Sequence, residues 1–292
     1  MIVNNKYKES AAAVGNFDGF HLGHKKIIET LQAAAERENL TSIILTFTPN
    51  PKQYFDKELN LISTDEQKRK ILEAQNVDRV IFLNFTEISN VPAQDFVKEI
   101  LVDKFKMKYI VVGENFKFGR DRGGDIESLR EMAGKFGFKP QLVTPVKIAG
   151  TRVSSTLTRE NLAAGNIEMA NRMLGRSYYI EGLIAEGDKM GRELGFPTIN
   201  IKTANLLLPE GVFKSKVEID CQVFDAITNV GFRPTFWGKE KRIESHIFKF
   251  DRIVYGKMAK VSFERKLRDE MKFSSKTNLI EQIKKDIENI RV

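Results

Sequence analysis

The stretch GNFDGFHLGH, residues Gly15–His24, decides how the first half of the chain folds. It follows the small apolar run 11–14 and precedes a segment in which Ile27, Ile28 and Leu31 recur at helical spacing. The sequence therefore predicts a strand, a glycine-rich turn and a helix. Glycines let the backbone of such a turn approach a bound group closely. The free N–H groups at a helix start favour a phosphate there.

Two of the three histidines of the chain, His21 and His24, lie in this turn. Three residues apart at a helix start, their imidazoles are expected to point to the same place. A histidine pair of this kind is also compatible with a helix cap or a chance metal site. The strand and glycine turn in front, and Gly23 between the histidines, favour a phosphate site. The H-x-G-H pattern behind this turn resembles the nucleotidyltransferase superfamily, which moves an AMP or CMP unit from a nucleoside triphosphate to a phosphate.

The length of 292 residues suggests about two domains and is ample for sizeable cores. No apolar run approaches the roughly 18 residues that a membrane span needs. The N-terminal residues contain no signal-peptide core. The single cysteine, Cys221, excludes an intramolecular disulfide. We therefore expect a cytoplasmic protein, with Cys221 as a small core residue.

The formal net charge of +8 raises the question of nucleic-acid binding. Basic residues alternate with acidic ones, however, as in residues 239–244, and the sequence contains no basic tail or zinc-finger spacing. Attraction for anionic small molecules such as ATP accounts for the charge as well. We expect no nucleic-acid partner.

Strand-like apolar runs alternate with helical patterns through the rest of the first half. The later runs are 41–47, 80–83, 109–112 and 141–143. Continuous apolar strands separated by helices predict a parallel sheet covered on both faces. Sites in such sheets lie beyond the carboxyl ends of the strands. The turn at Gly15 and the loop that starts at Gly113 both occupy that edge.

Two further segments carry polar chemistry. The loop 113–125 combines glycines, cations and aromatic residues, a mixture that suits phosphate contacts and ring stacking; it is also compatible with a surface loop of packed phenylalanines. The hydroxyl-rich segment 153–159 opens a helix that we expect to run through Leu162 and Ala163 to Leu174. Taken alone, its hydroxyls are ordinary helix caps.

These segments, in this order, resemble the N-terminal half of the prokaryotic bifunctional riboflavin kinase/FAD synthetase family, an FMN adenylyltransferase with a Rossmann-like sheet. The family patterns are G-N-F-D-G-x-H-x-G-H, G-x-D-F-x-F-G and S-S-T-x-x-R. The resemblance implies that His21 and His24 stabilise the ATP phosphates during attack by the FMN phosphate. It further implies that Arg159 is catalytic and that Asn115 and Phe116 bind the flavin. The ATP-binding residues that it implies are Gly15, Asn16, Phe17, Gly23 and Ser155. Such transfers depend on positioning and charge neutralisation.

The sequence departs from the family pattern in three segments. Residues 47–51 read F-T-P-N-P where the family usually has F-E-P-H-P, so Thr48 and Asn50 replace an acid and a histidine. Asn115 replaces the aspartate of G-x-D-F, and Leu157 stands where an arginine usually follows S-S-T. These departures keep open an alternative in which the adenylyltransferase half is weakened and the protein is mainly a kinase.

After about residue 175 the pattern changes to short strands separated by turn signals. The expected strands are 178–180, 183–185, 214–219, 226–230, 246–248 and 258–263. Strands of this kind suggest an antiparallel barrel or sandwich. Apolar residues 279–290 at helical spacing predict a closing helix laid on it. We therefore divide the chain into domains 1–175 and 176–292.

The segment 182–192 is rich in glycines and cations and precedes an extended segment. It is compatible with an ordinary turn or with a loop that wraps the phosphates of ATP, for which the candidate residues are Gly182, Gly187, Lys189 and Gly191. Thr198 and Asn200 are two residues apart and so face the same way on an extended chain. Their neutral oxygens make a modest site for Mg²⁺, which commonly takes few protein ligands plus phosphates and water.

Glu244 alternates with apolar residues on the segment 242–248. A carboxylate on a strand near a phosphate site suits a general base for an alcohol nucleophile. An exposed strand glutamate without a role is the alternative from spacing alone.

The second half resembles the riboflavin kinase module of the same family, on the patterns G-R-x-L-G-F-P-T-x-N at 191–200, N-V-G-F-R-P-T-F at 229–236 and E-x-H at 244–246. The resemblance implies a six-stranded barrel, Thr198 and Asn200 on Mg²⁺–ATP, and Glu244 as the base for the ribityl 5′-hydroxyl. Arg268 is placed near the flavin.

The whole sequence thus predicts an α/β Rossmann-like nucleotidyltransferase domain followed by an antiparallel β-barrel riboflavin kinase domain with a C-terminal helix. The expected activity is phosphorylation of riboflavin to FMN and adenylylation of FMN to FAD. Riboflavin, FMN and ATP are the expected partners. A flavin- or nucleic-acid-responsive binding protein is an alternative of another class, against which the retained Glu244 and histidines argue.

Overall fold

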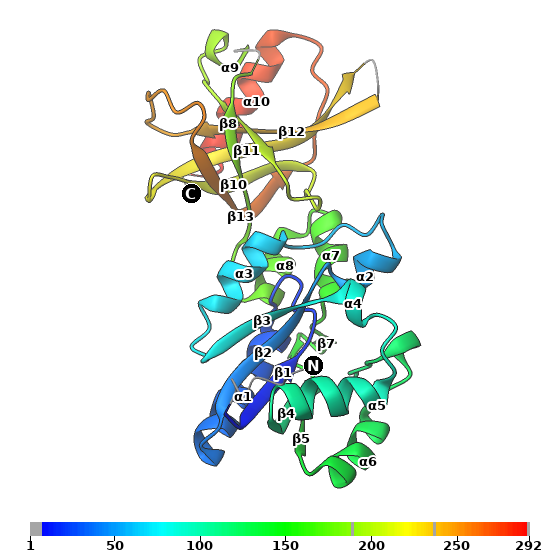
Figure 1. Cartoon of the computed structure of the whole chain (residues 1–292). Coiled ribbons are helices and arrows are strands. Elements are labelled where there is room, and N and C mark those ends of the chain that lie inside the picture. Colours follow the sequence, from blue (N-terminus) through cyan, green and yellow to red (C-terminus); the bar gives the residue numbers. More distant parts are fainter. Residues whose placement is uncertain (1–7, 188–189, 236–237, 291–292) are drawn as a thin grey trace. The chain divides into compact units, whose positions relative to one another are not determined.

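Five parallel strands form the sheet of the first half, in the order β3-β2-β1-β4-β5 (Figure 1). The strands are β1 (Ser10–Val14), β2 (Thr41–Thr48), β3 (Arg79–Asn84), β4 (Met107–Gly113) and β5 (Lys139–Val143). The parallel sheet predicted from the apolar runs is confirmed. The chain is represented here by a computed structural model, which describes residues 8–187, 190–235 and 238–290.

Both faces of this sheet are buried, as the continuous apolar strands predict. Alternate residues of β1, Ala11 and Ala13, lie in one core cluster with residues of the first helix such as Leu31. Their neighbours Ala12 and Val14 lie in a second cluster on the opposite face. Alanine on the central strand leaves room for the helices to pack closely on each face.

Helices connect the parallel strands. They are α1 (Leu22–Glu38), α2 (Pro51–Phe55), α3 (Asp65–Glu73), α4 (Phe85–Ile88), α5 (Ala93–Asp95), the π-helix η1 (Phe96–Lys104), the 3₁₀-helix η2 (Arg120–Arg122) and α6 (Ile126–Phe136). Local sequence sets several of their ends. Thr64 and Gln67 form a capping box at the start of α3, and Gly137 ends α6 in the left-handed conformation. A short hairpin of β6 (Lys147–Ile148) and β7 (Thr151–Arg152) follows β5.

The single helix expected from residue 155 to Leu174 is wrong. The structure has two helices there, α7 (Ser155–Ala163) and α8 (Ile167–Leu174). Gly165 has φ +74° between them, a left-handed conformation that a continuous helix cannot contain and that glycine adopts readily. The chain divides into two compact units, Met1–Ser155 and Thr156–Val292. α8 packs on the barrel of the second unit, and its Asn171 side chain donates to the carbonyl of Phe263 at 2.8 Å.

Six antiparallel strands form a closed barrel in the second unit, in the order β10-β11-β12-β9-β8-β13. The strands are β8 (Tyr178–Ala185), β9 (Ile199–Thr203), β10 (Gly211–Ile219), β11 (Gln222–Thr235), β12 (Gly238–Ile247) and β13 (Met258–Arg268). The antiparallel barrel is confirmed, but the two short strands expected at 178–185 are one strand. Gly182 interrupts the apolar pattern of this strand and so resembles a turn in the sequence. In the structure it is a strand residue, and glycine is needed there because a side chain would meet the carbonyl of Lys202 on β9.

Three buried hydroxyl side chains form a chain inside the barrel. The Ser215 and Thr228 hydroxyl oxygens are 2.7 Å apart, and those of Thr228 and Ser245 are 2.8 Å apart. All three side chains are fully buried. Residues 243, 245 and 247 of β12 therefore face inward, and by the alternation of a strand Glu244 and His246 face outward.

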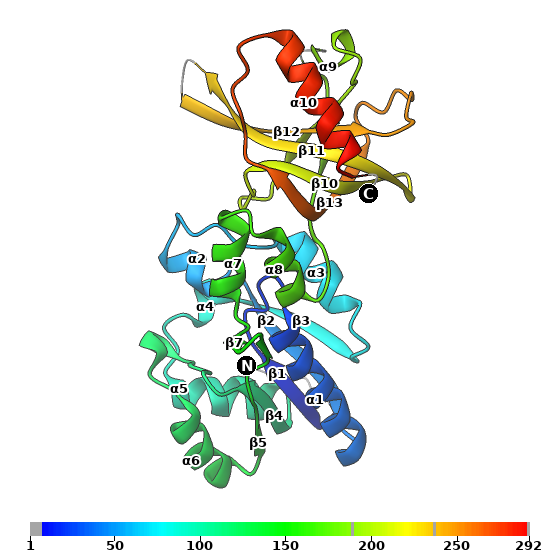
Figure 2. The same ribbon diagram turned by 180° about the vertical axis from the view of Figure 1, so that it is seen from behind.

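The closing helix predicted at 279–290 is confirmed as α10 (Lys276–Glu288). It crosses the outside of the barrel, as Figure 2 shows from behind. A short helix, α9 (Met190–Glu193), precedes β9. In the part of the chain that the structure describes, no helix is long and apolar enough to cross a membrane.

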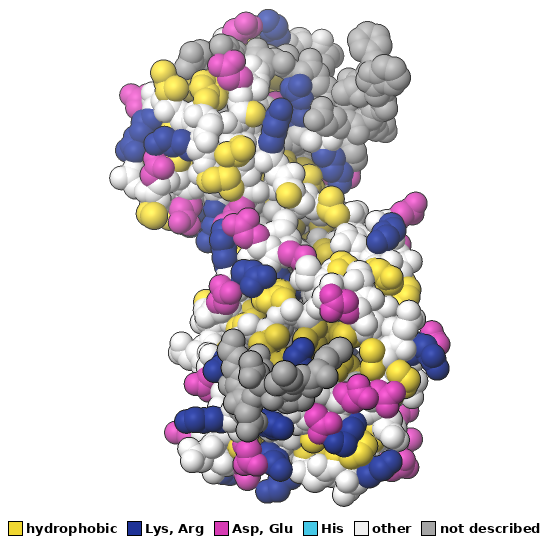
Figure 3. All heavy atoms as spheres, viewed as in Figure 1, with side chains coloured by type: hydrophobic (Ala, Val, Ile, Leu, Met, Phe, Trp, Pro, Cys, Tyr) yellow, Lys and Arg dark blue, Asp and Glu magenta, His cyan; other side chains and the backbone are white. Residues whose placement is uncertain are grey.

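Acidic and basic side chains are interspersed on the face of the molecule in Figure 3. Among the described residues drawn there, no stripe of a single sign runs across the surface. Interspersed charges provide little of the continuous phosphate neutralisation that nucleic-acid binding needs. The cysteine expected in the core, Cys221, is instead exposed, with φ +61° in the turn between β10 and β11.

Candidate active sites

The turn between β1 and α1 has an unusual backbone. Phe17, Gly19 and Phe20 have φ values of 51°, 75° and 41°. Such angles are costly for residues other than glycine, and they persist where surrounding contacts fix them. Here the buried Asp18 carboxylate accepts from the backbone N–H of Ile62 at 3.0 Å and from the next N–H at 3.2 Å. The turn is therefore held in one shape by the loop before α3.

The two histidines of this turn lie together, as predicted. Their rings stack with centroids 3.7 Å apart and an interplanar angle of 13°. His21 is the N-cap of α1, and its Nδ1 accepts from the backbone N–H of His24 at 3.3 Å. The Phe17 ring meets the His24 ring edge-on at 5.2 Å. The cap interpretation of His21 is therefore confirmed, and its role in a phosphate site stays a prediction.

Burial keeps both imidazoles neutral at pH 7. It lowers the pKa of His21 from 6.5 to about 4, with a smaller lowering from the Arg152 guanidinium. Burial lowers the pKa of His24 well below 6.5, and the His21 ring beside it adds to this. His24 Nδ1 is buried and has no hydrogen-bond partner among the residues the structure describes. Neutral imidazoles donate one N–H each to a bound group.

Most other residues predicted for this site surround the turn. A side chain at Gly23 would lie 3.0 Å from the His21 ring, and one at Gly15 would lie 3.2 Å from the Phe17 ring. The Ser155 hydroxyl donates to the carbonyl of Asp18 at 3.0 Å. The backbone carbonyl of Asn16 accepts from Thr46 at 3.3 Å. Their ATP contacts stay predictions.

Phe17 and Arg159 are two further residues predicted for this site. Phe17 is 1% exposed and belongs to the core, so only its backbone is available to a ligand. Arg159 lies in α7, which begins where the two units divide, and its part in the ATP site stays a prediction.

The loop after β4 is more closely packed than a free stacking surface. The Phe116 ring stacks on Phe118 with centroids 5.2 Å apart, and it packs against the core. Asn115 Oδ1 accepts from Arg152 Nη1 at 3.0 Å. Asn115 therefore still binds a cation where the family has an aspartate. Flavin binding by these two residues stays a prediction, and the packed-phenylalanine interpretation describes Phe116 well.

The residues that depart from the family pattern at 47–51 and 157 have different structural consequences. Asn50 caps α2, with its Oδ1 accepting from the Lys52 N–H at 3.0 Å. Thr48 Oγ1 is buried and finds no partner within the described part of the chain. Leu157 is half-buried in α7. Of the substituted residues Thr48, Asn50, Asn115 and Leu157, all of them described, Thr48 alone has a buried polar atom without a partner.

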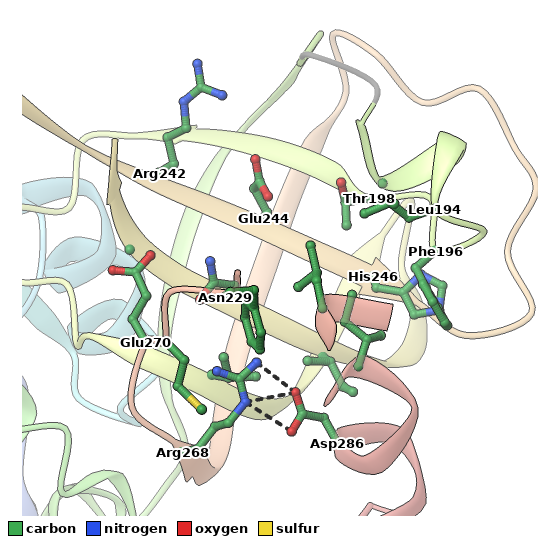
Figure 4. Close-up of a pocket in the computed structure, with 18 of the residues that line it drawn as sticks. Leu194, Phe196, Thr198, Asn229, Arg242, Glu244, His246, Arg268, Glu270 and Asp286 are labelled. Atoms are coloured by element: carbon green, nitrogen blue, oxygen red, sulfur yellow. Dashed lines mark hydrogen bonds and ion pairs between the residues drawn. The ribbon is translucent and has the colours of Figure 1, made fainter. Parts of the chain in front are cut away.

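A cavity of about 430 Å³ lies on the outside of the barrel, between its strands and α10 (Figure 4). Strand register places three polar residues of its wall in one row. Asn229 of β11 pairs with Glu244 of β12, which pairs with Asn200 of β9. Directly opposite side chains are roughly 5 Å apart at Cβ. In Figure 4 the Glu244 carboxylate and the Thr198 hydroxyl extend in the same direction.

The glycine loop before β9 packs directly on the predicted metal ligands. A side chain at Gly187 would overlap the Asn200 amide, and one at Gly191 would lie 3.1 Å from the Thr198 hydroxyl. Thr198, Asn200 and Gly191 line the cavity. Gly182 lies within β8, and strand packing explains its lack of a side chain. Lys189 lies outside the described residues.

Arg268 also lines the cavity but is held by α10. Its Nε donates to both Asp286 carboxylate oxygens at 3.1 and 3.0 Å, and its Nη2 donates at 2.9 Å. Gln282 donates to the same carboxylate at 2.8 Å, and Asp286 is 3% exposed. Arg268 therefore ties α10 to β13, and direct flavin contact stays a prediction.

Sequence reasoning missed several lining residues. The cavity lining includes six apolar side chains that were not predicted as site residues, Leu194, Phe196, Met271, Phe273, Leu279 and Ile283. Asn229 and His246 also line the cavity. Their alternation with apolar strand residues is visible in the sequence, but the register that brings the strands together is not. A second cavity of about 210 Å³ shares Thr198 with the first and includes Arg252 and Tyr255.

A parallel sheet with a histidine turn, joined to a barrel with a carboxylate-bearing cavity, defines a two-module nucleotide-dependent transferase. Residues 3–157 match the family model described as FAD synthetase, and residues 174–292 match the model described as Riboflavin kinase.

Curated relatives named "Bifunctional riboflavin kinase/FMN adenylyltransferase" match almost the whole chain. The protein from Haemophilus influenzae is 35% identical over 293 residues, covering 99% of this chain and 95% of the relative. That from Buchnera aphidicola of Schizaphis graminum is 34% identical, covering 97% and 93%. That from Bacillus subtilis is 32% identical, covering 98% and 92%. The chain belongs to the bifunctional riboflavin kinase/FMN adenylyltransferase family.

A solved structure shares the same fold over nearly the full length. It is 30% identical, has a TM-score of 0.89 and covers 97% of this chain and 94% of its own. Its title is "Crystal Structure of Macrolide-efflux Protein from Streptococcus pneumoniae". The activity named in that title differs from the names of the full-length relatives, so this likeness serves here for the fold.

Proposed function

We propose that this chain phosphorylates riboflavin to FMN in its barrel and adenylylates FMN to FAD in its parallel-sheet domain. The observation that carries the proposal is the row Asn229–Glu244–Asn200 on the cavity wall, in a chain that matches both family models. We place the functional boundary near residue 175, since the two matched regions leave residues 158–173 between them. A cytoplasmic location and the absence of a nucleic-acid partner stay predictions.

In the kinase reaction Glu244 is the general base. Its carboxylate accepts the proton of the ribityl 5′-hydroxyl as that oxygen attacks the terminal phosphorus of ATP and ADP leaves. The isoalloxazine ring fits the apolar wall formed by α10 and the segment around Phe273. Thr198 belongs to both cavities, which supports binding of the ATP nucleoside in the smaller one and of the phosphates near Thr198.

The oxygen atoms of Thr198 and Asn200 fit Mg²⁺ bound together with ATP, and they are too few to hold a metal ion without other ligands. Thr198 and Asn200 offer two neutral oxygens beside a glycine loop. Among the residues described, no group of three His, Cys, Asp or Glu side chains is arranged to hold a metal. Mg²⁺ commonly takes one or two protein ligands and completes its shell with phosphates and water. When bound, it neutralises charge on the ATP phosphates.

In the adenylyltransferase reaction the neutral His21 and His24 donate hydrogen bonds to the ATP phosphates at the start of α1. The FMN phosphate attacks the α-phosphorus, and pyrophosphate leaves. The N-terminal dipole of α1 favours the anionic group in the same place. Positioned donors of this kind stabilise developing charge without rearranging.

The orphaned Thr48 hydroxyl favours one second candidate, a kinase whose adenylyltransferase half is weakened. Chromatography of flavins after incubation with ATP and Mg²⁺, starting in one tube from riboflavin and in another from FMN, distinguishes the two. FAD in both tubes supports the bifunctional proposal. FMN from riboflavin, with no FAD in either tube, contradicts the proposal for the first half. Flavin binding without any product would instead favour a binding protein.

A further inference from the structure

Asn229 carries a buried hydrogen-bond acceptor that the structure leaves unpaired. Its Oδ1 is buried and has no partner in the described parts of the chain, and the residue lines the 430 Å³ cavity. Buried side-chain oxygens are paired in the large majority of cases, so an exception in a cavity wall calls for an explanation. A ligand that fills the cavity is the simplest source of the missing donor.

Strand register fixes where that donor would be. Asn229 on β11 is directly opposite Glu244 on β12, and Glu244 separates it from Asn200 on β9. The proposed metal ligands are thus on one side of the base and Asn229 is on the other. In Figure 4 Asn229 lies between Glu244 and Arg268. A group bound by Asn229 is therefore next to the attacking hydroxyl and away from the phosphates.

The chemistry of an amide oxygen selects among the possible groups. It accepts hydrogen bonds and does not attract phosphate oxygens. A polyol chain that ends at Glu244 has further hydroxyls, each a donor, along its length. Arg268, a strong donor that lines the same cavity, is already bound to Asp286.

We propose that Asn229 binds an internal hydroxyl of the ribityl chain and thereby selects a polyol substrate. The inference rests on the proposed kinase function of the barrel. A flavin without that hydroxyl leaves the buried oxygen unpaired, which costs more than the net value of an ordinary hydrogen bond. Sites built to bind a hydroxyl reject analogues that lack it for this reason. Asn229 is thus a specificity-determining residue beside the base.

The experiment measures kcat/KM of the full-length protein for riboflavin and for its 2′-, 3′- and 4′-deoxy analogues. The variants are Asn229→Ala, which removes the acceptor, and Asn229→Asp, which keeps one. Asn278→Ala on the exposed first turn of α10 is the matched control. FAD formation from supplied FMN reports in every variant whether the rest of the protein is intact.

The wild type is expected to discriminate against one deoxy analogue by about tenfold or more, in line with a hydrogen bond of about 1.5 kcal/mol. Asn229→Ala should lose that discrimination for the same analogue only, mainly through KM, and Asn229→Asp should retain it. An equal loss for riboflavin and all three analogues would overturn the inference, as would unchanged kinetics. A raised Mg²⁺ requirement in Asn229→Ala would overturn it in favour of a metal ligand. If the wild type phosphorylates no riboflavin, the proposed function fails instead.

Discussion

The two proposed sites differ in the chemical groups that they offer to a phosphate reaction. At the start of α1, two neutral stacked imidazoles lie in a strained turn against aromatic rings. On the barrel, the carboxylate of Glu244 stands in an open cavity whose walls also carry the ion pair Arg268–Asp286. The difference follows from the nucleophiles. An FMN phosphate is already an anion and needs only positioning and neutralisation, whereas a ribityl hydroxyl must lose a proton.

This comparison predicts that each site can be disabled alone. Glu244→Gln should lower FMN formation from riboflavin by roughly 10³-fold, within the range of general-base contributions. FAD formation from supplied FMN should be unchanged, and both rates can be followed by flavin chromatography. Loss of both activities would contradict the assignment of Glu244 to the kinase alone.

The opposite pattern is expected for the histidines. The double variant His21→Asn/His24→Asn keeps a good N-cap for α1, because asparagine is a preferred capping residue. It should lower FAD formation from FMN by roughly 10²- to 10³-fold, the usual cost of removing positioned donors. Riboflavin phosphorylation in the same samples is the control. Unchanged FAD output would refute the role of the pair.

A third variant tests how firmly the cavity wall is fixed. Asp286→Asn should destabilise the second unit by about 3 kcal/mol, since it leaves a largely buried guanidinium without its carboxylate. The KM for riboflavin should rise as α10 loosens. Urea unfolding measures the stability, and Glu218→Gln, which breaks the exposed Lys260–Glu218 pair, is the control with an expected change below about 1 kcal/mol. If the two variants lowered the free energy of unfolding equally, the Arg268–Asp286 ion pair would not stabilise the packing of α10 on β13.

The effect that is smallest near pH 7 concerns the pH dependence of the first unit. Between pH 6.5 and about 4 the unfolded chain binds a proton at His21 that the folded turn does not. Stability therefore falls as the pH is lowered through this range, by about 3 kcal/mol for a lowering of about 2.5 pKa units. Pulse proteolysis in urea on the intact chain, with fragments identified by mass, isolates this unit. The His21→Asn/His24→Asn variant removes both buried imidazoles, so it should lose at least about 3 kcal/mol less than wild type. An identical loss would argue against neutral buried histidines.

The parallel-sheet half could be predicted well from the sequence because its signals are local. Continuous apolar runs marked the strands, and the spacing of His21 and His24 placed both rings together. The main error, one helix in place of α7 and α8, arose at Gly165. Helical spacing of apolar residues continues across that position, and its left-handed backbone is not visible in the pattern.

The barrel site was less predictable because it depends on register between strands far apart in the chain. Alternation showed that Glu244 and His246 share a face. It did not show that Asn229 is directly opposite Glu244, or that Asp286 on α10 reaches Arg268 on β13. The sequence therefore contained no sign that Arg268 binds Asp286 on the helix, and its contact with the flavin stays a prediction.

The alternation of β12 has a consequence for changes in chain length. Ser245 faces the buried hydroxyl chain and Glu244 faces the cavity, so one inserted or deleted residue upstream in the strand would exchange the two faces. It would bury a carboxylate in the barrel and present a serine to the substrate. Insertions and deletions in this family should therefore gather in the turns between strands, while β12 keeps its length even where its sequence diverges.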